Sequence, residues 1–468
     1  MIFTEFRFLF FFLIAFSVFW LLHRNGRRKF WLLLCSYVFY GAWDWRFLSL
    51  IFISTVVDYI VGVKLFQASR PTHKKQWLLV SLIANLGILG FFKYFNFFIE
   101  STTQFFGFLG IPLSLATLNI VLPVGISFYT FQTMSYSLDI YSGKLKPVKT
   151  FLDFALYVSF FPQLVAGPIV RASTFLPQLE EPRKFEQVHF KACLMIFLIG
   201  FIKKACISDR LSPIVDQFFA APDTYTASSA WMGVLFYAVQ IYCDFSGYSD
   251  MAIACAGFLG YKLCLNFDFP YFAGNITSFW RRWHISLSTW LRDYLYIPLG
   301  GNRGTKLFIY KNLMLTMLLG GLWHGAGWNF IIWGALHGGA LIVHREWQRS
   351  VTGYKSLSTV MKVIGPLLTF YWVCLTWIFF RSTDFHTATI VFKSFVFFDS
   401  PGSHDLGIHL LWILVILSIV HFVAYQQLWK NWWEKAPDWV FAVWYGVAVS
   451  IAILFVAPNY SAFIYFQF

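Results

Sequence analysis

Apolar stretches of about twenty residues recur along almost the whole chain, and short basic loops separate them. Residues 1–22 are apolar and precede a loop at 23–29 that is rich in arginine and lysine. Residues 77–99 form another such stretch after a basic loop at 70–75. One helix needs about 20 apolar residues to cross the hydrocarbon core of a bilayer. The pattern therefore predicts a protein that crosses a membrane many times.

The small charged fraction supports the same interpretation. Only 12% of the 468 residues are charged and 58% are hydrophobic, whereas about 25% of a soluble domain is charged. Such a chain cannot bury its apolar surface in one aqueous core. We predict an all-α polytopic membrane protein with about eleven transmembrane helices, plus re-entrant or interfacial helices around a central tunnel. No stretch resembles a soluble domain or a repeat, so we expect one integral-membrane domain over residues 1–468, with a catalytic core at about 120–345.

The net charge of +14 is better explained by the membrane than by nucleic acid. Lysine and arginine gather in short loops, as the positive-inside rule requires of cytoplasmic loops. The seven cysteines are scattered, with no CxxC pair and no histidine or acidic residue at zinc-ligand spacing. We therefore expect no nucleic-acid partner, no disulfide framework and no metal.

His324 is the first candidate for chemistry. It follows Trp323 in a segment apolar enough to lie within the hydrocarbon core of a membrane, where an ionisable side chain indicates function. Imidazole can take and return a proton near neutral pH, which suits a general base. The neighbouring glycines would leave room for a bulky ligand. The alternative is a histidine that only packs between close helices, and residue type alone does not decide between them. His337 fits that packing role better.

His284 is the second candidate, and cationic and aromatic side chains surround it. On one continuous helix, Trp280 and His284 would share a face, which suggests an amphipathic element at the mouth of a cavity. Guanidinium groups there suit phosphates, although lipid headgroups would attract them equally. The glycine-rich loop at 296–306 is either a second phosphate contact or a plain turn. The candidate binding residues are Arg281, Arg282, Trp283, Trp323, Asn302 and Arg303.

Acidic residues within apolar stretches have a structural interpretation. Asp44 and Asp58 are expected to pair with an arginine or with backbone groups. Asp244 and Asp250 are six residues apart, so a straight helix does not place them on one face. We expect them to pair with arginine or tyrosine rather than to form a catalytic pair.

Several long motifs, in this order, resemble the membrane-bound O-acyltransferases, and within them the alginate O-acetylase branch of polysaccharide acetylation proteins. These motifs are FFPQLVAGPI at 160–169, YCDFSGYSD at 242–250, FWRRWHISL at 279–287, YIPLGGNR at 296–303 and LWHG at 322–325. The resemblance implies that His324 is catalytic and that His284 also matters.

The resemblance also implies an activity and a place. Acetyl-CoA would donate the acetyl group from the cytoplasmic side of a bacterial inner membrane. The acceptor would be a hydroxyl of an extracellular polysaccharide, with alginate, a cellulose-like exopolysaccharide or peptidoglycan as candidates. Transfer could run directly or through a periplasmic acetylation protein of the serine-hydrolase (SGNH) type. Broken helices and buried charges also fit a transporter or flippase of a lipid-linked sugar. A third alternative is a scaffold for a polysaccharide-secretion complex.

Overall fold

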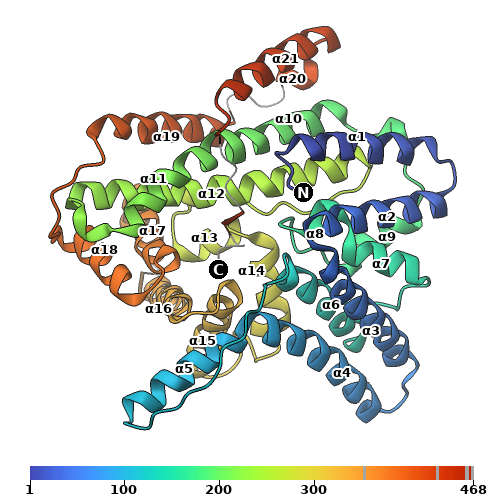
Figure 1. Cartoon of the computed structure of the whole chain (residues 1–468), viewed down its shortest axis with the longest axis horizontal. Helices are drawn as coiled ribbons and strands as arrows, with labels where there is room; N and C mark the ends of the chain where they lie inside the picture. Colours follow the sequence, from blue (N-terminus) through green and yellow to red (C-terminus); the bar gives the residue numbers. More distant parts are fainter. Residues whose placement is uncertain (352–354, 428–431, 459–462, 465–468) are drawn as a thin grey trace. The chain divides into compact units, whose positions relative to one another are not determined.

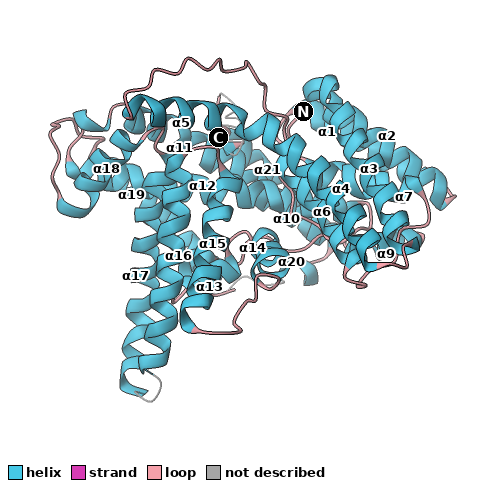
Figure 2. Cartoon of the chain, turned by 90° about the horizontal axis from the view of Figure 1, so that it is seen from below, coloured by secondary structure: helices cyan, strands magenta, loops and turns pink. Residues whose placement is uncertain are grey.

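The computed structural model describes residues 1–351, 355–427, 432–458 and 463–464. Over these residues the chain consists of helices and loops, with a single isolated bridge between Tyr225 and His404 and no strand (Figure 2). The predicted all-α fold is confirmed. In a bilayer this is expected, because a helix satisfies its backbone hydrogen bonds within one segment.

The chain forms two compact units. The first contains Met1–Cys193 and Met251–Cys264, and the second contains Leu194–Asp250 and Leu265–Phe468. The helices of the first unit are α1 (Phe6–Leu21), α2 (Asn25–Asp44), α3 (Leu48–Gln67), α4 (Pro71–Leu89), α5 (Phe95–Phe108), α6 (Ile126–Tyr141), α7 (Phe151–Ser159), α8 (Phe161–Leu164) and α9 (Ala172–Glu180), with most of α10 (Phe190–Phe201) left to the second unit (Figure 1).

A buried polar cluster ties α3, α4 and α6 together in the first unit. The Asp58 carboxylate is fully buried and accepts hydrogen bonds from Ser81 Oγ (2.5 Å), Ser137 Oγ (2.6 Å) and Asn85 Nδ2 (2.6 Å). A buried carboxylate needs such donors in place of water. Asp58 is therefore structural, as expected, but side-chain hydroxyl and amide groups hold it. Asp44 does pair with an arginine: Arg46 Nη2 lies 2.6 Å from Asp44 Oδ2.

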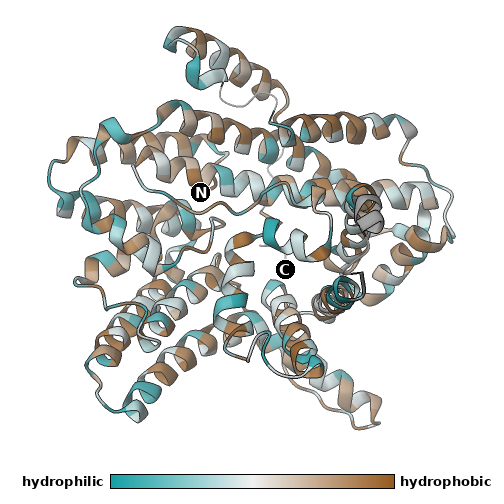
Figure 3. Cartoon of the chain, turned by 180° about the vertical axis from the view of Figure 1, so that it is seen from behind, coloured by the Kyte–Doolittle hydropathy of each residue, from teal (hydrophilic) through white to brown (hydrophobic). Residues whose placement is uncertain are grey.

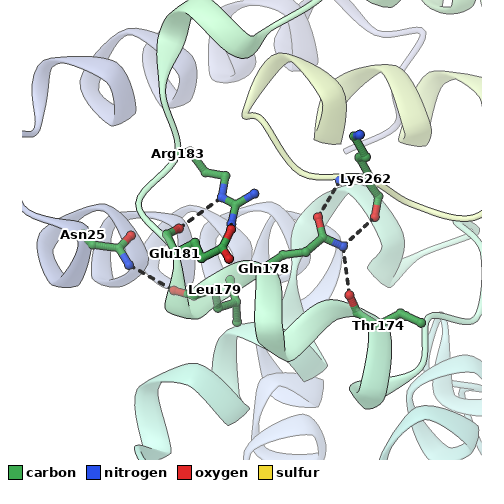
Figure 4. Close-up of polar contacts among 7 residues, drawn as sticks. All are labelled: Asn25, Thr174, Gln178, Leu179, Glu181, Arg183 and Lys262. Carbon is green, nitrogen blue, oxygen red and sulfur yellow. Dashed lines mark hydrogen bonds and ion pairs between the residues drawn. The ribbon is translucent and has the colours of Figure 1, made fainter.

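A second polar contact fixes the surface helix α9. The Gln178 side chain accepts from the backbone N–H of Lys262 (2.8 Å) and donates to the carbonyl of the same residue (3.0 Å), as Figure 4 shows. Asn25 Nδ2 also donates to Leu179 O (3.0 Å). These bonds join α9 to the start of α2 and to the loop that follows α12, all within the first unit.

The second unit carries the segment with both candidate histidines. Its helices are the rest of α10, α11 (Asp209–Ala220), most of α12 (Ala227–Phe258), α13 (Ile276–Arg282), α14 (Ile285–Leu291), α15 (Lys306–His324), α16 (Trp328–Val351), α17 (Lys355–Arg381), α18 (Phe385–Phe397), α19 (Leu411–Tyr425), α20 (Trp432–Lys435) and α21 (Asp438–Leu454). Across the described part of the chain, three π-helical stretches interrupt the helices: η2 (Gly90–Tyr94), η4 (Ile202–Ser208) and η7 (Arg292–Tyr296).

The helices have the surface of a membrane protein. Among the described residues, three helical segments are long and apolar enough to cross a bilayer, Asn25–Gln67, Pro71–Phe108 and Met361–Arg381, and four shorter helices are also apolar. Hydrophobic residues lie along most helices (Figure 3), and large ones such as Phe108 and Leu454 are exposed. Lipid, rather than water, suits such a surface. The multi-pass prediction is confirmed, while the number of eleven helices stays a prediction.

Candidate active site

The segment around His284 is a broken helix. Asn275 caps α13, since its Oδ1 accepts from Ser278 N (2.8 Å). The helix ends at Arg282, and α14 begins at Ile285. Between them His284 has φ 44° and ψ 55°, a left-handed conformation that is rare for a residue with a side chain. The continuous amphipathic helix that we expected here is therefore wrong: Trp280 lies on α13, whereas His284 lies in the turn between α13 and α14.

Asn266 holds this left-handed turn in place. Its carbonyl oxygen accepts from Ile285 N (2.9 Å), and its Oδ1 accepts from both the backbone N–H (3.2 Å) and the hydroxyl (2.9 Å) of Ser286. Its Nδ2 donates to Ser249 Oγ (3.2 Å), and the side chain is fully buried. A strained backbone of this kind costs of order 1–3 kcal/mol and persists only where its surroundings fix it. Nothing in the local sequence around residue 266 marked this role.

His324 is the last residue of α15, which packs closely against α16 (Figure 1). The approach depends on glycines. A Cβ at Gly321 would collide with the Phe330 carbonyl oxygen, and one at Gly334 with the Met317 carbonyl oxygen. At Gly325 the Phe330 ring occupies the same space. Gly321 and Gly325 therefore serve close packing, and not the open room for a ligand that the sequence suggested, whereas Gly327 has only ordinary contacts around it.

The two candidate histidines face one another. Their ring centroids are 6.3 Å apart, and the Trp323 ring lies 5.8 Å from His284 and 5.1 Å from His324. His284 is fully buried and His324 is 2% exposed. The structure thus brings together three of the predicted site residues, although His284 precedes the adjacent Trp323 and His324 by about 40 positions.

Aromatic rings surround the pair. Phe245 of α12 meets His284 edge-on at 4.6 Å between centroids, while Trp333 and Phe380 lie 4.9 Å and 5.3 Å from His324. Such a shell excludes bulk water. Exclusion of water strengthens electrostatic interactions and protects a reactive acyl group from hydrolysis.

The remaining predicted residues lie outside this pair. Trp283 is fully buried and packs on Phe279 (5.7 Å) and Trp377 (5.1 Å). Arg281 is exposed, whereas Arg282 is partly covered and lies over the Tyr425 ring at 6.0 Å. Both arginines end α13, where a positive charge interacts favourably with the helix dipole.

The loop with Asn302 and Arg303 lies beside the first half of α15, whereas His324 ends that helix. Asn302 Oδ1 accepts from Tyr296 Oη (2.9 Å) and from Arg345 Nη1 (2.7 Å). A helix rises 1.5 Å per residue, so the start of α15 is about 27 Å from His324 along the axis. The loop therefore does not touch the histidine pair, and any donor-binding role would concern a distant part of a long ligand.

His337 has the packing role that the sequence favoured. It is fully buried on α16, and its Nε2 lies 3.0 Å from Thr376 Oγ1 of α17. Because the Thr376 hydroxyl donates to Val373 O (2.8 Å), it accepts from the Nε2–H of His337. This bond joins two helices.

Asp244 and Asp250 pair with lysines, and not with the arginine or tyrosine that we expected. Lys204 Nζ lies 2.5 Å from Asp244 Oδ1, and Lys203 Nζ lies 2.7 Å from Asp250 Oδ2. The structural interpretation was right about the absence of a catalytic carboxylate pair but wrong about the partners. Within the described residues, no group of acidic, histidine and cysteine side chains could hold a metal ion.

A polytopic helical protein with a buried pair of histidines in an aromatic shell has the features of a membrane enzyme that moves protons with imidazole. The chain belongs to the membrane-bound O-acyltransferase family: the family model MBOAT matches residues 148–383, which include both histidines. The protein is therefore an acyltransferase.

Its relatives carry more particular names. The chain is 42% identical to the probable alginate O-acetylase of Azotobacter vinelandii over 87% of this chain and 80% of that protein. It is 36% identical to the peptidoglycan O-acetyltransferase of Helicobacter pylori over 94% of this chain and 91% of that protein. A more distant match, at 28% identity over 55% of this chain and 68% of that protein, is the teichoic acid D-alanyltransferase of Streptococcus thermophilus.

Proposed function

We propose that this protein transfers acetyl groups from cytoplasmic acetyl-CoA across a bacterial inner membrane for the O-acetylation of an extracellular polysaccharide. The names of the two O-acetylating relatives support acetyl as the acyl group and a cell-envelope or secreted polymer as the final acceptor. The acceptor that meets the histidines is either the polymer itself, such as alginate, a cellulose-like exopolysaccharide or peptidoglycan, or a periplasmic partner protein of the serine-hydrolase type.

One observation carries the proposal: the rings of His284 and His324 lie close together inside a buried aromatic shell, with centroids 6.3 Å apart. In the proposed reaction, an imidazole nitrogen of His324 takes the proton of the acceptor hydroxyl as its oxygen attacks the thioester carbonyl carbon. A new C–O bond forms and the C–S bond breaks. The leaving thiolate then receives the proton from His324, so that an acetyl ester and free coenzyme A result.

His284 has a different proposed role. Its position at a fixed left-handed turn makes it a rigid group beside His324, suited to orienting the acyl donor. Trp323 lies against both rings and would keep the acyl group between them. The positive charge for the phosphates of coenzyme A comes from Arg281, Arg282 and Arg303. The proposed donor-binding region also includes Asn302 and Trp283.

Purified protein with radiolabelled acetyl-CoA and an acceptor polymer tests the proposal. We expect His324→Ala to lower kcat by about 10²–10⁴-fold, the usual contribution of a general base. The exposed histidine His386 offers a matched control, because His386→Ala removes an imidazole that is not part of the buried pair. Wild-type protein that consumes no thioester would indicate a transporter or scaffold instead, and an active His324→Ala variant would exclude the proposed base.

A further inference from the structure

A buried ionic cluster joins the π-helical stretch η4, the start of α11 and the middle of α12, and its Asp244 directly precedes Phe245 of the aromatic shell. Lys204 Nζ lies 2.8 Å from Asp209 Oδ1 and 2.5 Å from Asp244 Oδ1, and all three side chains are at most 3% exposed. Two carboxylates thus share one ammonium group. A buried carboxylate that shares its counter-ion needs further hydrogen-bond donors to offset its lost hydration.

The far end of the chain provides one of these donors. The backbone N–H of Ile464 donates to Asp244 Oδ2 at 2.8 Å, although 220 positions separate the two residues. Two residues shortly before it in the sequence are bound to the same region. Ala457 N donates to Ala205 O (3.1 Å), and Arg210 donates to Val456 O (3.0 Å). Residues 455–457 and residue 464 are therefore bound to one region of the second unit.

The residue before Ile464 completes the link to the site. Phe463 is fully buried, and its ring packs on Phe245 (5.4 Å) and Tyr248 (5.3 Å), both of α12. Phe245 is the ring that meets His284 edge-on at 4.6 Å. A continuous set of contacts thus leads from the ionic cluster through Phe463 and Phe245 to the imidazole of His284.

We propose that Phe463–Ile464 is a positioning segment for His284, and that the Lys204–Asp244 ion pair is the latch that holds it. Removal of Phe463 leaves a void behind Phe245, so that the aromatic shell around His284 loosens and the imidazole gains freedom. The effect on catalysis rests on the proposed function, whereas the effect on the packing of His284 does not.

Carbethoxylation by diethyl pyrocarbonate, quantified by mass spectrometry at His284, tests the packing directly in the full-length, detergent-solubilised protein. We expect Phe463→Ala to raise the labelling rate of His284 by at least about tenfold, because loss of a buried phenyl ring opens a cavity. Phe463→Leu should restore most of the protection. Phe455→Ala is the matched control, since it removes a phenyl ring from the same end of the chain that is 60% exposed.

The latch itself is tested at residue 244. Asp244→Asn keeps an oxygen that can accept the Ile464 N–H and should protect His284 better than Asp244→Ala does, while Asp209 still pairs with Lys204. Unchanged labelling in both Phe463→Ala and Asp244→Ala would overturn the inference.

Kinetics separate this inference from the proposed function. Acetyl transfer by Phe463→Ala should show a kcat lowered by about tenfold or more with KM for acetyl-CoA changed less than about twofold, the pattern of lost orientation without lost binding. If the wild-type protein transfers no acetyl but Phe463→Ala still speeds the labelling of His284, the proposed function is overturned and the positioning role of Phe463 is supported. If the wild-type protein is active and Phe463→Ala is equally active, the positioning role of Phe463 is overturned.

Discussion

The hydrogen bonds of Asn266 make a sharp prediction about how His284 is held. Asn266→Ala removes the oxygen that accepts from the N–H and the hydroxyl of Ser286, and it also removes the donor to Ser249. A buried polar group that loses its partner costs about 1–3 kcal/mol. The left-handed backbone at His284 costs a similar amount, of order 1–3 kcal/mol. The lost bonds are therefore large enough for the turn between α13 and α14 to relax.

A relaxed turn moves the imidazole, and a displacement of about 1 Å in a reacting group can lower a rate by about 10²-fold. We expect Asn266→Ala to lower kcat to this extent while the protein still elutes as a folded species in detergent. Ser249→Ala is the graded control: it removes only the outer bond, worth about 1 kcal/mol, and should lower kcat by about tenfold or less.

The assay is steady-state transfer of labelled acetyl, with thermal midpoints measured on the same preparations. An Asn266→Ala variant with a normal kcat and a normal midpoint would refute the reasoning, because it would show that the turn needs no support from this side chain.

Further predictions concern stability and packing. At His284, substitution by glycine should give a thermal midpoint higher than substitution by alanine, because only glycine adopts a positive φ without strain; equal midpoints would argue against the left-handed turn. Gly321→Ala should abolish acetyl transfer and lower the midpoint, since its Cβ meets a backbone oxygen, whereas Gly339→Ala, with open space around it, should be tolerated. Asp58→Leu should destabilise the first unit more than Asp58→Asn, which keeps an acceptor for the serine hydroxyls, and the reverse order would disprove a role for these bonds. Asp384 caps α18, and the N–H of residue 387, together with hydroxyl donors, lowers the pKa of its carboxyl group. Asp384→Ala should lower the free energy of unfolding by about 1 kcal/mol near neutral pH, and this loss relative to the wild type should vanish as the pH falls through the lowered pKa. A loss of stability that does not depend on pH would contradict the ionic cap.

The sequence predicted the class of fold well, since apolar length and low charge leave few alternatives to a helical membrane protein. It also identified His324 and His284 as the candidate pair. It could not predict that His284 interrupts a helix, because the turn depends on Asn266, which lies outside the local pattern. Glycines that allow close helix packing and glycines that admit a ligand look alike in a sequence, so the interpretation around His324 failed for a physical reason.

Long-range contacts explain the other differences. The partner of Asp244 is Lys204, 40 positions earlier, and its further donor is a backbone amide at residue 464. No periodicity links these positions. Asn302 and Arg303 share a motif-rich segment with the histidines, but the rise of α15 separates the loop from them.

The close contact between α15 and α16 has a consequence for genetics. Backbone touches backbone at Gly321 and Gly334, and the histidine sits at the tip of the first of these helices. A single added methyl group acts there as a wedge that tilts the tip. A screen for inactive variants should therefore identify these two glycines as often as the histidines. Such variants would lose activity because the end of α15 is displaced, and not because a contact with substrate is lost.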